Sequence, residues 1–186
     1  LAGVCYVSTQ TNVNVINCQT LSSTIIANAN SASGIVGISF NIFEPHNINI
    51  KNCKTVNTDI TNEATSRSNT AGILAEGVVA KENIVNIENC EVSGGSITTK
   101  GGNIGGICNL AYADGNGDTL IKDCNVSQVQ ITHQNASASL SSNCGGIAGV
   151  INDDLAIIEN CEVTDSNITA TGVQNVSGMV GFTWFR

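Results

Sequence analysis

The chain has 186 residues, 41% of them hydrophobic and 4% aromatic, which is enough apolar material for one folded domain. A formal net charge of −8, with only seven Lys and Arg residues along the whole chain, excludes a basic surface for nucleic acid. Because no apolar run approaches the roughly 20 residues of a membrane-spanning helix, we expect no insertion into a membrane.

The predicted elements, taken in chain order, repeat around one hexapeptide. Its copies are VINCQT (15–20), IKNCKT (50–55), IENCEV (87–92), IKDCNV (121–126) and IENCEV again (158–163). Successive cysteines are 35, 37, 34 and 37 positions apart, and an isoleucine always stands seven residues after the cysteine. A second column, a glycine followed by an aliphatic residue, alternates with the hexapeptides. It comprises Gly3-Val4, Gly34-Ile35, Gly72-Ile73, Gly106-Ile107, Gly146-Ile147 and Gly178-Met179.

The hexapeptides lie in segments with an apolar residue at every second position, which is the period of a strand and not of a helix. This alternation slips at the residue before each cysteine, which is always Asn or Asp. The column consists of Asn17, Asn52, Asn89, Asp123 and Asn160. Because Asn and Asp tolerate left-handed backbone conformations, we predict a corner of the strand at this position.

Similar strands that recur at this spacing can stack on themselves as the rungs of a coil, which rises about 4.8 Å per turn. An outward column alternates in charge, so that neighbouring rungs place opposite charges side by side. Its members are Lys51, Glu88, Lys122 and Glu159. We therefore predict an all-β fold, a right-handed parallel β-helix (β-solenoid) of about five coils of 31–40 residues, in one domain over residues 1–186.

Glycine motifs such as GGIAG (145–149) and GMVG (178–181), followed by a hexapeptide such as IENCEV, resemble the GLUG-motif repeats of large secreted and cell-surface proteins. The resemblance covers nearly the whole chain. It implies a β-solenoid stalk that serves as a structural or adhesive module of a longer protein. In two copies the closing glycine of the motif is replaced, by Ala75 and by Asn109.

Eight cysteines would suit a secreted disulfide framework, but the spacing favours another arrangement for five of them. Cysteines on in-register parallel strands cannot easily reach the disulfide dihedral angle of about 90°, so a column of stacked, buried, unbridged thiols is expected. This column contains Cys18, Cys53, Cys90, Cys124 and Cys161. Outside it lie Cys5, Cys108 and Cys144, of which only Cys108 and Cys144 form a candidate bridge. We expect His46 and His133 in solvated loops.

Two further kinds of site are predicted on polar segments. The segment DGNGDT places Asp114, Asn116 and Asp118 at alternate positions, as in a calcium loop, although the glutamate that completes such a loop is missing. Calcium is thus the only cofactor considered. Asn-x-Ser/Thr acceptors for N-glycosylation, expected on outward positions or variable loops, are Asn125, Asn135, Asn167 and Asn175.

No converging pair of carboxylates, nucleophile motif or phosphate loop is visible, so we expect no enzyme activity and no catalytic residue. The predicted function is an extracellular structural or adhesive segment of a stalk, surface fibre or filament. Its partners would be further rungs of the same chain or stacked copies of it, and glycans. The aromatic residues expected at the stacking end are Phe182, Trp184 and Phe185. The alternative is a carbohydrate-active or carbohydrate-binding β-helix, which would need two unpaired acids on one face.

Overall fold

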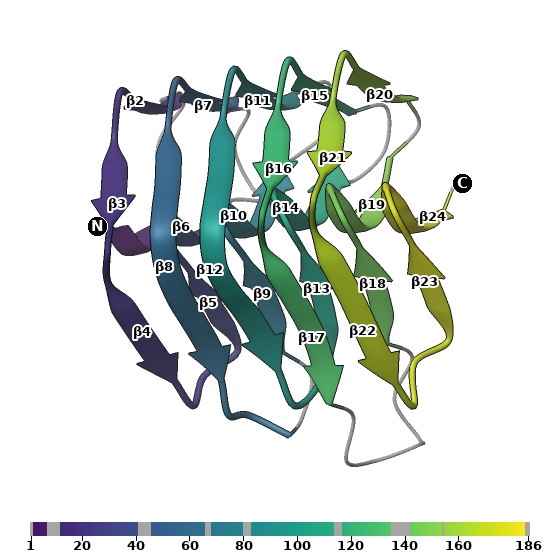
Figure 1. The fold of residues 1–186 in the computed structure, drawn as a ribbon. Coiled ribbons are helices and arrows are strands. Elements are labelled where there is room, and N and C mark those ends of the chain that lie inside the picture. The colour runs from purple at the N-terminus through teal and green to yellow at the C-terminus, as the bar shows by residue number, and fades with distance from the viewer. Residues whose placement is uncertain are drawn as a thin grey trace.

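The computed structural model describes residues 2–6, 12–40, 46–65, 68–79, 83–113, 117–134, 142–153 and 155–184. Strands are the only regular elements in these ranges, and they form four parallel sheets, A to D, around one axis (Figure 1). Each turn passes through sheets B, C, D and A in that order. The chain descends in sheet C at the front and returns behind it while it advances from the N-terminus to the C-terminus, which is the right-handed sense (Figure 1). The predicted fold class is confirmed.

Sheet B lies along the top of the coil in Figure 1, and sheet A runs across its middle. Sheet A contains β1 (Ala2–Tyr6), β6 (Val36–Phe40), β10 (Leu74–Val79), β14 (Cys108–Ala113), β19 (Ala148–Asn152) and β24 (Val180–Trp184). Sheet B contains β2 (Val13–Ile16), β7 (Ile48–Lys51), β11 (Ile84–Glu88), β15 (Asp118–Lys122) and β20 (Leu155–Glu159).

Sheets C and D complete each turn. Sheet C contains β3 (Gln19–Leu21), β4 (Thr24–Ala27), β8 (Lys54–Asn62), β12 (Glu91–Thr99), β16 (Asn125–Ser127), β17 (Gln130–Gln134), β21 (Glu162–Thr164) and β22 (Asn167–Thr171). Sheet D contains β5 (Ser31–Ser33), β9 (Asn69–Ala71), β13 (Asn103–Gly105), β18 (Asn143–Gly145) and β23 (Asn175–Ser177).

The strands pair in the register that the charge column predicts. Glu88 pairs with Lys51 on one side and with Lys122 on the other. The Lys51 Nζ lies 2.6 Å from Glu88 Oε2, and the Lys122 Nζ lies 3.9 Å from Glu159 Oε2. Exposed pairs of this kind contribute only about 0.2–1 kcal/mol each. Their main effect is on register, because a slip of one rung would place like charges side by side.

The chain turns from sheet B into sheet C at the Asn/Asp column, as predicted. All five residues have a left-handed φ: Asn17 58°, Asn52 55°, Asn89 52°, Asp123 52° and Asn160 52°. At three of the four steps along this column an amide Nδ2 donates to the side-chain oxygen one rung below, whereas Asp123 has no amide to donate to Asn89. The donor–acceptor distances are 3.1 Å for Asn52 to Asn17, 2.7 Å for Asn89 to Asn52 and 3.1 Å for Asn160 to Asp123.

A second left-handed position follows five residues later and bends sheet C itself. Its members are Ser22, Asn57, Gly94, Gln128 and Asp165. In the first, fourth and fifth rungs this bend divides the strand in two, whereas β8 and β12 continue through it. The sequence did not indicate this corner, because its five positions share no residue type.

The glycine column forms the tight bend between sheets D and A. The amide of Gly34 donates to the carbonyl oxygen of Gly72 at 3.0 Å, and the amide of Gly72 donates to that of Gly106 at 2.9 Å. One predicted member is misplaced: Ala2 pairs with Val36 and Val4 with Ile38. The first glycine therefore aligns with Gly37, the closing glycine of the motif, and not with Gly34.

Polar side chains also point into the coil, and the expectation of two solvated histidines is wrong. His46 and His133 are each 1% exposed. In β17, His133 lies two positions after the buried Ile131 and therefore faces the same side. Its Nε2 donates to the carbonyl oxygen of Gly102 at 2.7 Å, and burial lowers its pKa. The buried polar residue thus satisfies a carbonyl group of the turn between sheets C and D.

Candidate functional site

The five hexapeptide cysteines form a continuous column of thiols along the coil. Cys53, Cys90 and Cys124 are buried, Cys161 in the last rung is half-buried, and Cys18 in the first rung is exposed. Their thiols donate to backbone carbonyl oxygens, as from Cys53 to Lys51 at 3.3 Å and from Cys124 to Lys122 at 3.1 Å. Burial raises the pKa of the Cys53 thiol to about 11, which keeps it protonated at neutral pH.

All cysteines with described side chains are free, and the candidate bridge between Cys108 and Cys144 is absent. Cys108 begins β14 of sheet A and pairs with Ala148, whereas Cys144 lies in sheet D and pairs with Ile104. The two thiols occupy different columns and both are 0% exposed. Burial raises the pKa of Cys144 to about 12, so neither nucleophilic attack nor metal binding is favoured there.

A thiol assay checks the state of the column. Protein that is denatured without reductant should show at least the five column cysteines free towards an aromatic disulfide reagent. The reason is geometric, because in-register parallel strands disfavour the disulfide dihedral angle. A protein with no reactive thiol under these conditions would contradict the stacked arrangement.

The predicted calcium loop is only partly described. Asp114 and Asn116 lie outside the described residues, and Asp118 begins β15, where it pairs with Ile84 and Leu155. Within the described ranges there is no group of three or more His, Cys, Asp or Glu side chains arranged to hold a metal ion. Calcium binding stays a prediction that rests on the sequence alone.

The described glycosylation acceptors all begin strands. Asn125 begins β16, Asn167 begins β22 and is exposed, and Asn175 begins β23; Asn135 lies outside the described residues. Asn175 was expected in a variable loop, but its Nδ2 donates to Asn143 Oδ1 at 2.7 Å. Asn167 Nδ2 likewise donates to Gln130 Oε1 at 2.9 Å, so a glycan on either residue would replace a contact between rungs.

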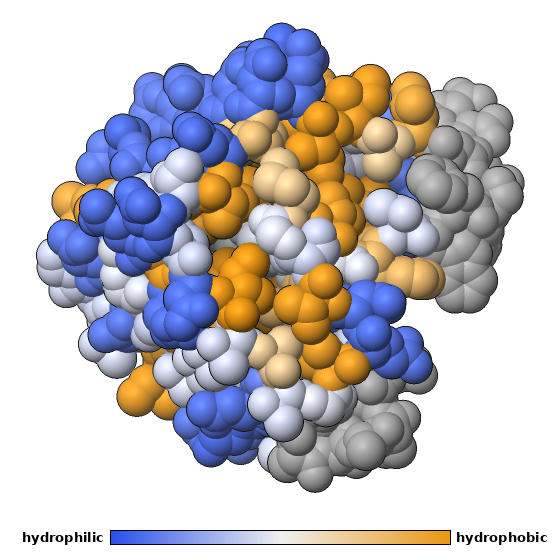
Figure 2. Space-filling model, turned by 45° about the vertical axis from the view of Figure 1, so that its right-hand side comes forward, coloured by the Kyte–Doolittle hydropathy of each residue, from blue (hydrophilic) through white to orange (hydrophobic). Residues whose placement is uncertain are grey.

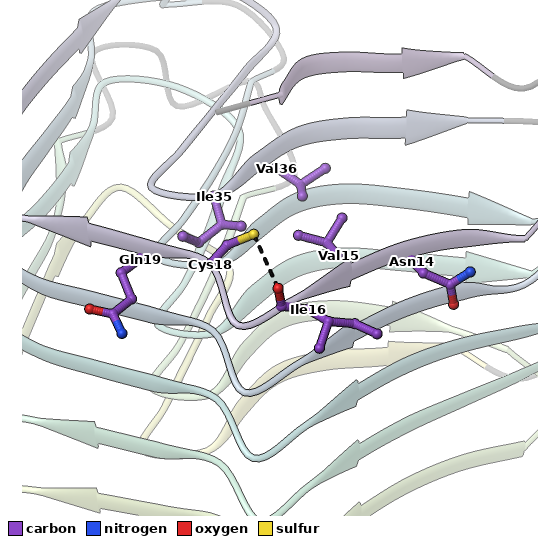
Figure 3. Close-up of a pocket in the computed structure, with 7 residues that line it drawn as sticks. All are labelled: Asn14, Val15, Ile16, Cys18, Gln19, Ile35 and Val36. Carbon is purple, nitrogen blue, oxygen red and sulfur yellow. Dashed lines mark hydrogen bonds between the residues drawn. The ribbon is translucent and has the colours of Figure 1, made fainter.

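The N-terminal end of the coil is an open rung with a cavity in it (Figure 3). The cavity has a volume of about 340 Å³, and its lining comes from the first rung: Asn14, Val15, Ile16, Cys18, Gln19, Ile35 and Val36. On the outer face of the same rung, Ile16, Leu21 and Ile26 are 49%, 55% and 72% exposed. Lys51, Val56 and Thr61 take their places in the second rung, so two of the three positions turn polar there.

The C-terminal end also exposes side chains of the core columns. Val176 pairs with the buried Cys144 but is itself 52% exposed, and Met179 follows Ile147 in its column and is 36% exposed. Phe182, one of the predicted stacking residues, is 38% exposed. Hydrophobic side chains gather across this end in Figure 2. Phe185 and the side chain of Trp184 lie outside the described part.

Four carboxylates on the outer face of the rungs form ion pairs with lysines. Glu88 and Glu91 bind the lysines of the preceding rung at 2.6 Å and 2.8 Å, and Glu63 pairs with Lys100. The bond from Lys54 lowers the pKa of Glu91. No described helix is long and apolar enough to cross a membrane.

No protein-family model matches the chain, and no curated protein matches it. Its fold is similar to a solved structure, a putative immunoglobulin A1 protease from Bacteroides ovatus, with a TM-score of 0.58 and 23% sequence identity. The match covers 90% of this chain and 48% of that chain, so this chain spans about half the length of the protein it matches. At this identity the likeness shows the β-solenoid fold alone. The resemblance to GLUG-motif repeats stays a prediction.

Proposed function

We propose that this chain is a structural segment of an extracellular surface protein, with no catalysis, whose coil is extended by further rungs into a stalk, fibre or filament. The observation that carries the proposal is the contrast between inner and outer rungs. Ile50, Ile87 and Ile121 of one column are each 0% exposed, whereas their partner Ile158 in the last rung is only half-buried.

Open rungs combine two features that favour association. Each presents apolar core side chains and also the unpaired N–H and C=O groups of edge strands. Solenoid repeats obtain stability from the interface with the next repeat, so an uncovered rung lacks one of its two interfaces. A further rung of the same kind would bury these side chains and pair these backbone groups at once.

The outward ladders support rungs of the same kind as the occupant, in preference to an unrelated protein. Asn side chains bond from rung to rung in sheet B, with Asn49 Nδ2 donating to Asn14 Oδ1 at 3.1 Å. Lys and Glu alternate beside them and end at Glu159, which faces a lysine on one side only. A next rung with a basic residue in this column would continue the alternation.

The number of strands distinguishes two ways of adding rungs. Within the described residues sheet A has six strands, from β1 to β24, whereas sheets B and D have five. If two copies stacked head to tail, β24 of one and β1 of the next would occupy the same level of sheet A. Stacked copies therefore require one of these strands to leave, whereas continuation of one polypeptide does not.

Analytical ultracentrifugation tests the proposal. Residues 1–186 should self-associate as concentration rises, and residues 12–186, which lack β1, should associate more strongly. Met179→Asp should abolish association, because it places a charge in the open core column. Thr169→Asp, on the outer face of the same rung, is the matched control and should associate like the parent. Dispersed monomers at every concentration for both lengths, with ordered end rungs by hydrogen exchange, would refute the proposal.

A further inference from the structure

The cysteines of the thiol column are regularly spaced along the coil, and packing alone does not require this spacing. They lie in register, since the amide after each cysteine donates to the carbonyl oxygen of the cysteine one rung below. Lys54 donates to Cys18 at 2.9 Å, and Glu91 donates to Cys53 at 3.0 Å. The sulfurs therefore follow the spacing of the rungs. Their hydrogen bonds are weak thiol bonds to backbone carbonyls, such as Cys53 to Lys51 at 3.3 Å.

The spacing of the column suits a metal bridge better than a disulfide. Neighbouring rungs are about 4.8 Å apart. A disulfide needs its sulfurs at about 2.05 Å and a dihedral angle near 90°, so it would distort two rungs. A metal–thiolate bond is about 2.3 Å long, so two such bonds in line span about 4.6 Å. A cation held in line between two rungs fits the column without moving the backbone.

A monovalent cation keeps the charge of a site neutral with the loss of one proton. Cys53, Cys90 and Cys124 of the column lie in the apolar core, where an uncompensated charge is costly. When one thiol loses its proton to water and its sulfur bonds to a monovalent cation, the charge of the core is unchanged. The second sulfur completes the coordination with a lone pair. A divalent ion would need to displace two protons at each site to reach the same balance.

The donor set selects a soft metal. Sulfur is the donor throughout, and soft thiolate ligands select Cu(I) and similar ions. A four-coordinate zinc site needs more ligands than two rungs supply, and the described residues contain no cluster of three. We propose that the column binds soft monovalent cations of the Cu(I) and Ag(I) class, each in line between two rungs, and that Cys18 and Cys53 form the first site.

Access is provided at the N-terminal end. Cys18 is exposed and lines the cavity of about 340 Å³, beside Val15 and Ile35 (Figure 3). Cys53 lies directly beneath it in the next rung. A cation can therefore reach the first pair of sulfurs from solvent without unfolding, whereas the inner pairs are covered by the rungs on both sides.

Titration of the reduced protein with silver nitrate in chloride-free buffer tests this proposal. Native mass spectrometry should show one Ag(I) bound at the lowest ratio. Alkylation with iodoacetamide and peptide mapping should then show that Cys18 has become protected. Zn²⁺ at the same concentration should give neither result.

Variants distinguish a bridge from binding to a single surface thiol. Cys53→Ala removes the partner but leaves Cys18, and it should weaken the first binding by more than about tenfold, since even the loss of an outer-shell partner commonly costs that much. Cys18→Ser removes the other sulfur of the pair, at an exposed position. It should weaken the first binding of silver by a similar factor. Cys144→Ala removes a buried thiol outside the column and should change nothing. Unchanged silver affinity in Cys53→Ala or Cys18→Ser would overturn the proposal, as would first binding at Cys144.

Discussion

Replacing Gly72 by alanine should destabilise the protein by at least about 3 kcal/mol, whereas the same change at Gly178 should have almost no effect. A Cβ atom on Gly72 would lie 2.5 Å from the carbonyl oxygen of Gly106 and 2.5 Å from Val92 Cγ2. The carbonyl belongs to the backbone of the next rung, so it cannot move away without breaking the ladder. Gly178 occupies the same column in the last rung and has nothing within 4 Å of the position of its Cβ.

Urea denaturation of both variants measures this difference at equal protein concentration. Because both changes are Gly→Ala in one column, their intrinsic conformational effects largely cancel. Equal destabilisation would show that Gly178 is also covered, or that the close approach of rungs at Gly72 is absent. Either outcome would contradict the stacking described here.

Replacing Ile87 by alanine should cost about 2–5 kcal/mol, the usual range for a buried isoleucine. Ile87 is 0% exposed and packs between Ile50 and Ile121 of the neighbouring rungs. Ile158→Ala should cost clearly less in the isolated segment, because Ile158 is half-buried and has a partner strand on one side only.

The same pair of variants reports whether the end is covered. Chemical denaturation at low concentration gives the cost in the monomer, and repetition under associating conditions gives the cost in the assembly. If further rungs cover the last one, the cost of Ile158→Ala should rise towards that of Ile87→Ala. A cost that stays low in the assembled form would place the contact between copies elsewhere.

The parts of the fold that could be predicted from sequence are those in which one residue type recurs at one position. Asn or Asp before every cysteine indicated a left-handed corner, and the alternating charges indicated the register. The corner and the register could be predicted because each rung repeats the same residue types at these positions. The second corner was missed because Ser22, Gly94 and Gln128 reach the same conformation for different local reasons.

Other positions depend on contacts that the sequence does not display. His133 follows an inward isoleucine by two residues, and this alternation predicts that it is buried. The carbonyl oxygen of Gly102, which accepts its hydrogen bond, can be identified only in the structure. Asn175 was predicted to lie in a loop. Its hydrogen bond to Asn143 crosses between rungs and cannot be seen in the sequence. The alignment of Gly3 failed because both glycines of the motif look alike in sequence.

The candidate site was predicted in outline only. The sequence places aromatic residues near its C-terminal end, of which Phe182 is exposed, and their role in stacking stays a prediction. The exposure of Val176 and Met179 was not predicted, because aliphatic residues in core columns are exposed only where no further rung covers them. The cavity beside Cys18 likewise depends on three-dimensional packing, since its lining comes from three strands and two turns.

Electron microscopy of the native, mature protein tests the central claim most directly. If the coil continues through added rungs, the images should show uniform rods that lengthen by about 4.8 Å for each turn of the coil, with residues 1–186 inside the rod. Antibody fragments against the outer face of sheet C should then decorate the shaft. Compact particles without a rod, or a rod from which this segment projects as a separate globular body, would contradict the account.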